Sequence, residues 1–262
     1  MARPSVLLRG SSGAGTDRDK AADFPLNGER AMNNRISIQG RNGTFGAYIA
    51  RPENAPAPAV VVLHEVFGIN ADIREKCDEL AEQGFIGVAP ELYWRQEKGV
   101  DLSVRSEPDW QHGLRLNQAY DRDGGAMDIK DTAETVAKLP ECTGKVGLMG
   151  YCIGGLMTFL TTVRYGIDAA VAYHGGETEK YLDEAGGFRA PMLMHLGEED
   201  EFISKTAQAQ IKAALTSKPN VTIYSYPGQW HAFTRINGVH YNAQAAALAN
   251  GRTTEFLKRQ LF

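Results

Sequence analysis

A cysteine with a glycine two residues away on either side is the first candidate for chemistry in this chain. Gly150, Cys152 and Gly154 form the pattern G-x-C-x-G. The pattern follows the apolar run 145–149 and precedes a helix-like segment, which predicts a strand, a tight turn and a helix. In that setting the glycines leave room for a nucleophile at strained backbone angles, and the helix start stabilises a thiolate or an oxyanion. The alternative is a small buried cysteine at a strand–helix contact, but its placement favours a nucleophile.

A thiol nucleophile needs a base, and the preferred candidate is His231. It lies after the last expected strand and before the last expected helix, where a loop returns to the carboxyl edge of a parallel sheet. His64 and His174 end strands at that same edge and remain alternatives. The other three histidines are predicted to be non-catalytic. His195 lies in an apolar run and is expected in the core, whereas His112 and His240 lie in polar surroundings.

Asp200 is the candidate acid that orients the base. It ends a G-x-x-D turn after a strand, which would bring its carboxylate back to the sheet edge. Three neighbouring carboxylates are predicted to face solvent: Glu198, Glu199 and Glu201. The chain order Cys152, Asp200, His231 is nucleophile, acid, base, which is the order of the α/β-hydrolase plan.

An oxyanion hole needs two converging N–H donors. The backbone N–H of Ile153, one residue after the cysteine, is expected to be the first, and that of Val66 the second. Glu65 precedes Val66 at a buried strand end, where an unpaired carboxylate would be costly. It is interpreted either as an ion pair with an arginine or as a partner of the Cys152 thiol.

The elements that must position these residues are short apolar runs alternating with amphipathic segments. The runs expected to be strands are 36–38, 44–50, 59–63, 85–89, 145–149, 169–173, 191–196 and 221–224. The expected helices are 70–83, 126–139, 154–165, 204–215 and 241–261. This alternation predicts an α/β fold, a mostly parallel central sheet with helices on both faces, and the first two strands read as an antiparallel hairpin. The irregular segment 94–110 is a candidate lid.

Length and composition agree with one domain. The chain has 262 residues, long enough for a sizeable core, and we expect a single domain over 32–262. Residues 1–31 are expected to be a flexible or vector-derived extension ahead of a start at Met32, with a genuine amino-terminal arm as the alternative. We expect a monomer or a homodimer.

Net charge and cysteine content limit which partners, compartment and cofactors can be expected. A formal net charge of −4 without a basic face argues against nucleic acid, and no apolar run approaches the length of a membrane helix. The chain has three cysteines, Cys77, Cys142 and Cys152, whose spacing suggests neither disulfide pairing nor metal binding. This fits a reducing, cytoplasmic location. The histidines lack an H-x-x-x-H spacing, so neither a metal nor a cofactor is expected.

From about Ile36 to the end, the chain resembles the dienelactone hydrolase (carboxymethylenebutenolidase) family. The resemblance rests on HEVFGIN, ELYWRQ, KVGLMGYCIGG, LGEEDEF, WHAFTR and AAALANGRTTEFL taken together. It implies an α/β-hydrolase domain with the triad Cys152, His231 and Asp200. It also implies that Glu65 interacts with the thiol, which ionises when substrate rearranges that glutamate.

The resemblance also implies how substrate binds, with one departure. The family binds the substrate carboxylate with two arginines, and Arg235 matches one of them. The other position falls on Trp110, for which Arg105 or Arg115 would have to substitute. Together with Trp94 and Tyr93, Trp110 suggests a more apolar pocket, in which Trp110 and Tyr93 contact substrate.

We therefore expect a cofactor-free carboxylic-ester hydrolase. Cys152 would attack a small-molecule ester or lactone and form a thioacyl-enzyme, with promiscuity toward aryl esters or phosphotriesters as a further prediction. The alternative from another class is a non-catalytic relative that binds a ligand or senses redox state through Cys152.

Overall fold

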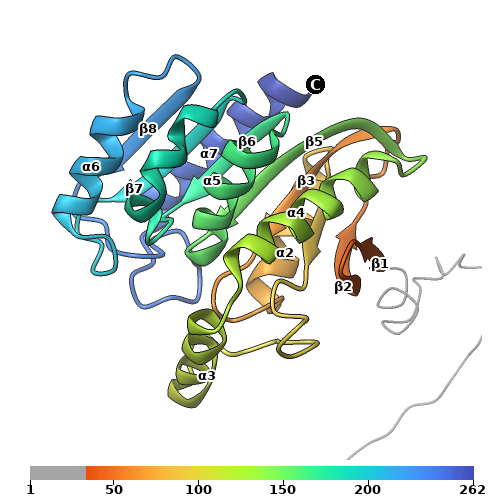
Figure 1. Cartoon of the computed structure of the whole chain (residues 1–262), viewed down its shortest axis with the longest axis horizontal. Helices are drawn as coiled ribbons and strands as arrows, with labels where there is room; N and C mark the ends of the chain where they lie inside the picture. The colour runs from red at the N-terminus through yellow and green to blue at the C-terminus, as the bar shows by residue number, and fades with distance from the viewer. Residues whose placement is uncertain (1–33) are drawn as a thin grey trace, which may run out of the picture. The chain divides into compact units, whose positions relative to one another are not determined.

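An eight-stranded sheet of order β1-β2-β4-β3-β5-β6-β7-β8 carries the fold in the computed structural model (Figure 1). Its strands are β1 (Arg35–Gly40), β2 (Gly43–Ala50), β3 (Ala57–Leu63), β4 (Ile86–Pro90), β5 (Cys142–Tyr151), β6 (Ala169–Tyr173), β7 (Met192–Gly197) and β8 (Val221–Tyr226). The structure describes residues 34–262, and the expected boundary between residues 31 and 32 lies outside them.

The sheet is parallel from β4 to β8 and antiparallel at one edge. β1 and β2 form the predicted hairpin, and β2 also pairs antiparallel with β4. Strands β3 and β6 are buried along their whole length, as the continuous apolar run 59–63 predicted for the first of them. The carboxyl ends of β3, β5, β6 and β7 therefore meet at one edge, and the loops that follow them carry the candidate site residues.

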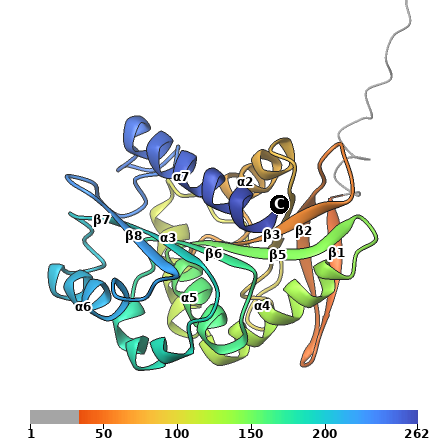
Figure 2. The ribbon, with the colours of Figure 1, turned by 90° about the horizontal axis from the view of Figure 1, so that it is seen from above.

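Helices cover both faces of the sheet, as predicted (Figure 2). They are α2 (Ala71–Glu82), α3 (Glu107–Gln118), α4 (Arg122–Ala137), α5 (Ile153–Tyr165), α6 (Lys205–Leu215) and α7 (Ala243–Leu261), with the 3₁₀ segment η1 (Thr178–Gly187). Helices α2 and α7 pack on one face and α4, α5 and α6 on the other. Helix α4 begins four residues before its predicted start, because the Asp121 side chain accepts from the N–H groups of Asp123 and Gly124.

Two elements were not predicted, α3 and η1. The segment 94–110 was expected to be irregular, yet α3 begins within it, capped by the Ser106 side chain on the Asp109 N–H. Only Gly113 and Leu116 of α3 are buried, so the helix has a weak apolar period to detect. The start of the segment is anchored rather than loose, because Trp94 Nε1 donates to the buried Asp128 at 2.8 Å.

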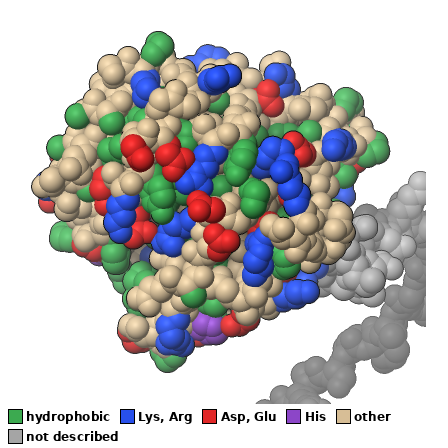
Figure 3. Space-filling model, in the orientation of Figure 1, with side chains coloured by type: hydrophobic (Ala, Val, Ile, Leu, Met, Phe, Trp, Pro, Cys, Tyr) green, Lys and Arg blue, Asp and Glu red, His purple; other side chains and the backbone are tan. Residues whose placement is uncertain are grey.

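The surface seen in Figure 3 carries charges of both signs, interspersed rather than gathered in one area. Ion pairs account for part of this pattern, such as Arg164 with Glu184 at 2.6 Å and Lys145 with Asp168 at 2.9 Å. None of the helices within residues 34–262 is long and apolar enough to span a membrane.

Candidate active site

Cys152 occupies a strained turn between β5 and α5. Its φ of 55° and ψ of −118° lie in a region that side chains rarely adopt. The flanking glycines are required by close contacts: a Cβ on Gly150 would lie 2.0 Å from the Gly154 carbonyl oxygen, and one on Gly154 would lie 2.2 Å from the Leu63 carbonyl oxygen. The turn predicted from G-x-C-x-G is therefore present, with a half-buried thiol at the start of α5.

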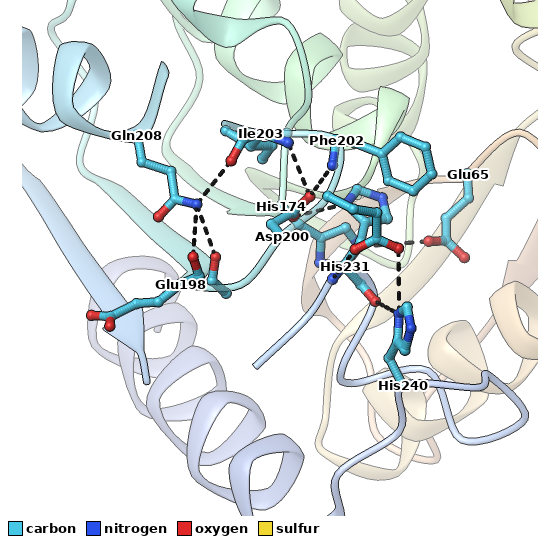
Figure 4. A network of polar contacts seen from close by, with 12 residues as sticks. Glu65, His174, Glu198, Asp200, Phe202, Ile203, Gln208, His231 and His240 are labelled. Atoms are coloured by element: carbon cyan, nitrogen blue, oxygen red, sulfur yellow. Dashed lines mark hydrogen bonds and ion pairs between the residues drawn. The ribbon is translucent and has the colours of Figure 1, made fainter. Parts of the chain in front are cut away.

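His231 and Asp200 meet as predicted, although 31 residues separate them. His231 Nδ1 is 2.8 Å from Asp200 Oδ2, and both side chains are buried. The other carboxylate oxygen of Asp200 accepts from the N–H groups of Phe202 and Ile203, at 2.8 and 3.0 Å (Figure 4). Burial alone would raise the pKa of Asp200, but these hydrogen bonds and the His231 charge hold it below its ordinary value.

The electrostatics of His231 suit a base that pairs with a thiolate. Burial alone would lower the pKa of the ring, but the charge of Cys152 and the hydrogen bond to Asp200 raise it to about 10. Since Nδ1 is bonded to Asp200, Nε2 is the nitrogen left for proton transfer, and it has no hydrogen-bond partner within residues 34–262.

The other histidines divide much as expected. His64 is not free to act as a base, because its Nδ1–H donates to the Glu65 carbonyl at 2.6 Å and its Nε2 accepts from the Leu92 N–H at 3.2 Å. Burial lowers the pKa of His64 to about 4. His195 is a core residue bonded to two hydroxyl groups, and His112 pairs with a surface glutamate. His240, expected in polar surroundings, is partly exposed and lines the cavity described below.

Glu65 is held in a buried ion pair. Its Oε2 accepts from Arg235 Nη1 at 2.8 Å, and its Oε1 is 3.5 Å from His174 Nε2. Burial alone would raise the pKa of Glu65, but the Arg235 and His174 charges hold it well below its ordinary value. Of the two interpretations of Glu65, the structure shows the ion pair with an arginine. That arginine is Arg235, the residue predicted to bind the substrate carboxylate, so Glu65 occupies it in this structure.

Removing one member of this pair should be costly. In Arg235→Met the Glu65 carboxylate stays buried without its partner, so we expect a loss of about 3–5 kcal/mol in the free energy of unfolding at pH 7. The loss should shrink at low pH. In the wild type the folded-state pKa of Glu65 lies well below its unfolded value, so the stability from the pair is lost as the pH falls below about 4 and the unfolded chain takes a proton on Glu65. In the variant the folded chain can also take that proton, which relieves the unpaired buried charge. Urea unfolding across pH measures both effects.

The double variant Glu65→Gln/Arg235→Met is the matched control. It removes both charges, so most of the lost stability should return. An equal loss in the single and double variants would show that packing, not the unpaired charge, is responsible.

The cysteine and histidine open onto a cavity of about 940 Å³ at the carboxyl edge of the sheet. Cys152, Ile153, Val66, Glu65, His231 and Arg235 line it. Three aromatic side chains, Phe67, Trp110 and Phe202, also line it and form an aromatic wall. The ring centroid of Trp110 lies 5.6 Å from that of Phe67 and 6.1 Å from that of Phe202. Sequence reasoning missed Phe202, because nothing in a turn sequence indicates on which side a side chain stands.

One predicted substrate contact must be corrected. Tyr93 is not among the residues that line the cavity: it is buried in the core against Tyr120, with ring centroids 5.5 Å apart. Glu201 is exposed, as expected, and it also lines the cavity and accepts from the His231 backbone N–H at 3.2 Å. Of the two substitute arginines, Arg105 lines the cavity and Arg115 does not.

Known proteins resemble this chain over almost all of the described part. Residues 45–261 match the model of the Dienelactone hydrolase family. A carboxymethylenebutenolidase of Pseudomonas putida is 38% identical over 223 residues, covering 85% of this chain and 94% of the relative. An Azospirillum brasilense protein assigned as a carboxymethylenebutenolidase is 38% identical over 229 residues, 86% of this chain and 98% of the relative. Among solved structures, one from Klebsiella pneumoniae, assigned as a dienelactone hydrolase, has a TM-score of 0.77 at 26% identity and covers 86% of this chain and 97% of that one.

Proposed function

This chain belongs to the dienelactone hydrolase family and is an ester or lactone hydrolase, and we propose that Cys152, His231 and Asp200 carry out the reaction through a thioacyl-enzyme. The observation that supports this most strongly is the geometry at Cys152. A cysteine at φ 55° opens onto the same cavity as a histidine whose Nδ1 is held 2.8 Å from a buried carboxylate. A ligand-binding or redox-sensing relative would have no need of the second and third residues.

In the first half-reaction, His231 Nε2 takes the Cys152 proton and the thiolate attacks the substrate carbonyl carbon. The carbonyl electron pair moves onto oxygen, where the N–H groups of Ile153 and Val66 stabilise it. Collapse of this intermediate breaks the bond to the leaving oxygen, which takes the proton from His231. The products are an alcohol, or the opened end of a lactone, and an acyl group on sulfur.

In the second half-reaction, His231 takes a proton from water, which attacks the thioester carbon. The carbon–sulfur bond then breaks and the acid leaves. His231 returns its proton to sulfur, which restores the Cys152 thiol. Asp200 keeps the His231 proton on Nδ1 throughout, so that Nε2 accepts and donates. The proposed steps use only groups of this chain and water.

A substrate carboxylate would compete with Glu65 for Arg235. Arg235 Nε is buried and has no hydrogen-bond partner within residues 34–262, which supports a site for an anionic group. Displacement of Glu65 from this pair would free its carboxylate to act on the Cys152 thiol. The Trp110 wall suits an apolar or aryl portion of the substrate, and turnover of aryl esters or phosphotriesters stays a prediction.

The acyl-enzyme itself provides the test. Wild-type enzyme mixed with p-nitrophenyl acetate and quenched in acid should gain the mass of one acetyl group, mapped by peptide mass spectrometry to Cys152. Half-buried Cys142 lies outside the cavity and serves as the internal control. Turnover without acylated Cys152 at any quench time, or an acetyl group on Cys142, would contradict the proposal.

A further inference from the structure

Three buried side chains from distant parts of the chain converge beside Cys152. Glu65 follows β3, His174 follows β6 and His231 follows β8. One ligand atom from each lies within 4.8 Å of the other two, and His174 Nε2 is 3.5 Å from Glu65 Oε1 (Figure 4). The His174 and His231 rings meet edge to face, with centroids 4.5 Å apart.

The nitrogens of this cluster lack well-formed hydrogen bonds. Neither ring nitrogen of His174 and not Nε2 of His231 makes one of good geometry within residues 34–262, although the two residues are only 1% and 4% exposed. Their neighbours are the Glu65 carboxylate, 3.5 Å from His174 Nε2, and the Cys152 thiol beside His231. Buried polar nitrogens are almost always paired, so one ring nitrogen of His174 and Nε2 of His231 are available to a shared ligand. His174 is also held at φ 38°, a conformation unusual for a residue other than glycine.

The donor set suits zinc. Two imidazole nitrogens and one carboxylate oxygen are the ligands that Zn²⁺ takes in many proteins, with a fourth tetrahedral position left for water or a thiolate. Bonds of about 2.0–2.1 Å place two tetrahedral ligands roughly 3.3 Å apart, close to the 3.5 Å between His174 and Glu65. All three ligand atoms lie within 4.8 Å of one another, so the set would contract by at most about 1.5 Å to bind the ion. Asp200 already orients His231 through Nδ1, as carboxylates do for zinc-binding histidines.

We propose that Glu65, His174 and His231 form a zinc-binding site, and that the bound ion inhibits the hydrolase. The imidazole binds metal in its neutral form, so the ion occupies the lone pair of His231 Nε2 while Nδ1 keeps its hydrogen bond to Asp200. Nε2 can then no longer accept the proton of Cys152. The ion also engages the Glu65 carboxylate. Binding is independent of the proposed reaction, whereas inhibition rests on His231 being its base.

Calorimetric titration of metal-free enzyme with ZnCl₂ tests the site directly. We expect one ion per chain in the wild type and a Kd at least about tenfold weaker in His174→Phe. Phenylalanine keeps a ring against His231 and removes the nitrogen that lies 3.5 Å from Glu65. His174→Gln is the second variant if His174→Phe does not fold.

The matched control is His240→Gln, a histidine that lines the same cavity but lies outside the cluster. Its Kd should stay within about twofold of the wild type. An equal loss of zinc affinity in His240→Gln and in the His174 variants would overturn the site, and so would unchanged affinity in the His174 variants. Anomalous scattering at the zinc edge should place the ion on the three named side chains, and a peak elsewhere would overturn it as well.

Hydrolysis of p-nitrophenyl acetate with added zinc then tests inhibition. The wild-type rate should fall with an IC50 near the measured Kd and return with EDTA, and the IC50 of His174→Phe, relative to its own zinc-free rate, should rise by the same factor as its Kd. Absence of zinc binding in an active enzyme would overturn this site and leave the proposed function intact. Zinc bound at the three residues without loss of activity would overturn both the inhibition and the role of His231 as base.

Discussion

Replacing Cys152 by alanine should lower kcat/KM for p-nitrophenyl acetate by about 10,000-fold or more, because the variant has no atom to form the acyl-enzyme. The oxyanion donors and the cavity remain, so a small residual rate above that of water is expected. Since Cys152 is only half-buried and alanine is smaller, the fold should tolerate the change. Steady-state kinetics under metal-free conditions, with thermal unfolding recorded for both proteins, measure the effect.

Cys142→Ser is the matched control for this result. Cys142 is also a half-buried free cysteine, but it lies at the start of β5 and away from the cavity. Its activity should equal that of the wild type. If Cys152→Ala kept a tenth or more of the wild-type rate while remaining folded, Cys152 would not be the nucleophile.

Replacing Asp200 by asparagine should lower kcat by roughly 1,000- to 10,000-fold, through the tautomer of His231. The asparagine amide would donate to Nδ1, which forces the ring proton onto Nε2 and leaves no lone pair to accept the Cys152 proton. The side-chain oxygen of asparagine can still accept from Phe202 and Ile203, so the turn should keep its shape. The activity loss should therefore come with little change in the unfolding temperature.

The same substitution should be visible in the titration of His231. The hydrogen bond to Asp200 contributes to the raised pKa of His231, about 10 in the wild type. Without that bond the pKa should fall, which ¹⁵N NMR of the ring measures. Glu199→Gln is the control, because Glu199 lies in the same turn but is exposed and pairs with Lys205 at 2.9 Å. An Asp200→Asn enzyme within about tenfold of wild-type kcat would contradict the role of Asp200.

Much of the fold was predictable because its signals are local. Continuous apolar runs such as 59–63 identified buried strands, and the helix predicted over 70–83 is α2, with Asn70 as its N-cap. The strained turn at Cys152 was predictable for the same reason, since the glycines that permit it are two residues away. Helix α3 escaped prediction because only two of its residues are buried, which leaves almost no periodic pattern in the sequence.

The sequence by itself determined the order of the elements and the strained turn at Cys152, because backbone preferences and apolar periodicity act over a few residues. Only the tertiary structure decided which side chains meet at the sheet edge. Glu65 pairs with Arg235 across 170 residues, Tyr93 turns into the core, and His174 comes within reach of His231. Parallel strands bring distant loops to one edge, but rotamers and packing set where each side chain points, and neither is encoded in residue spacing.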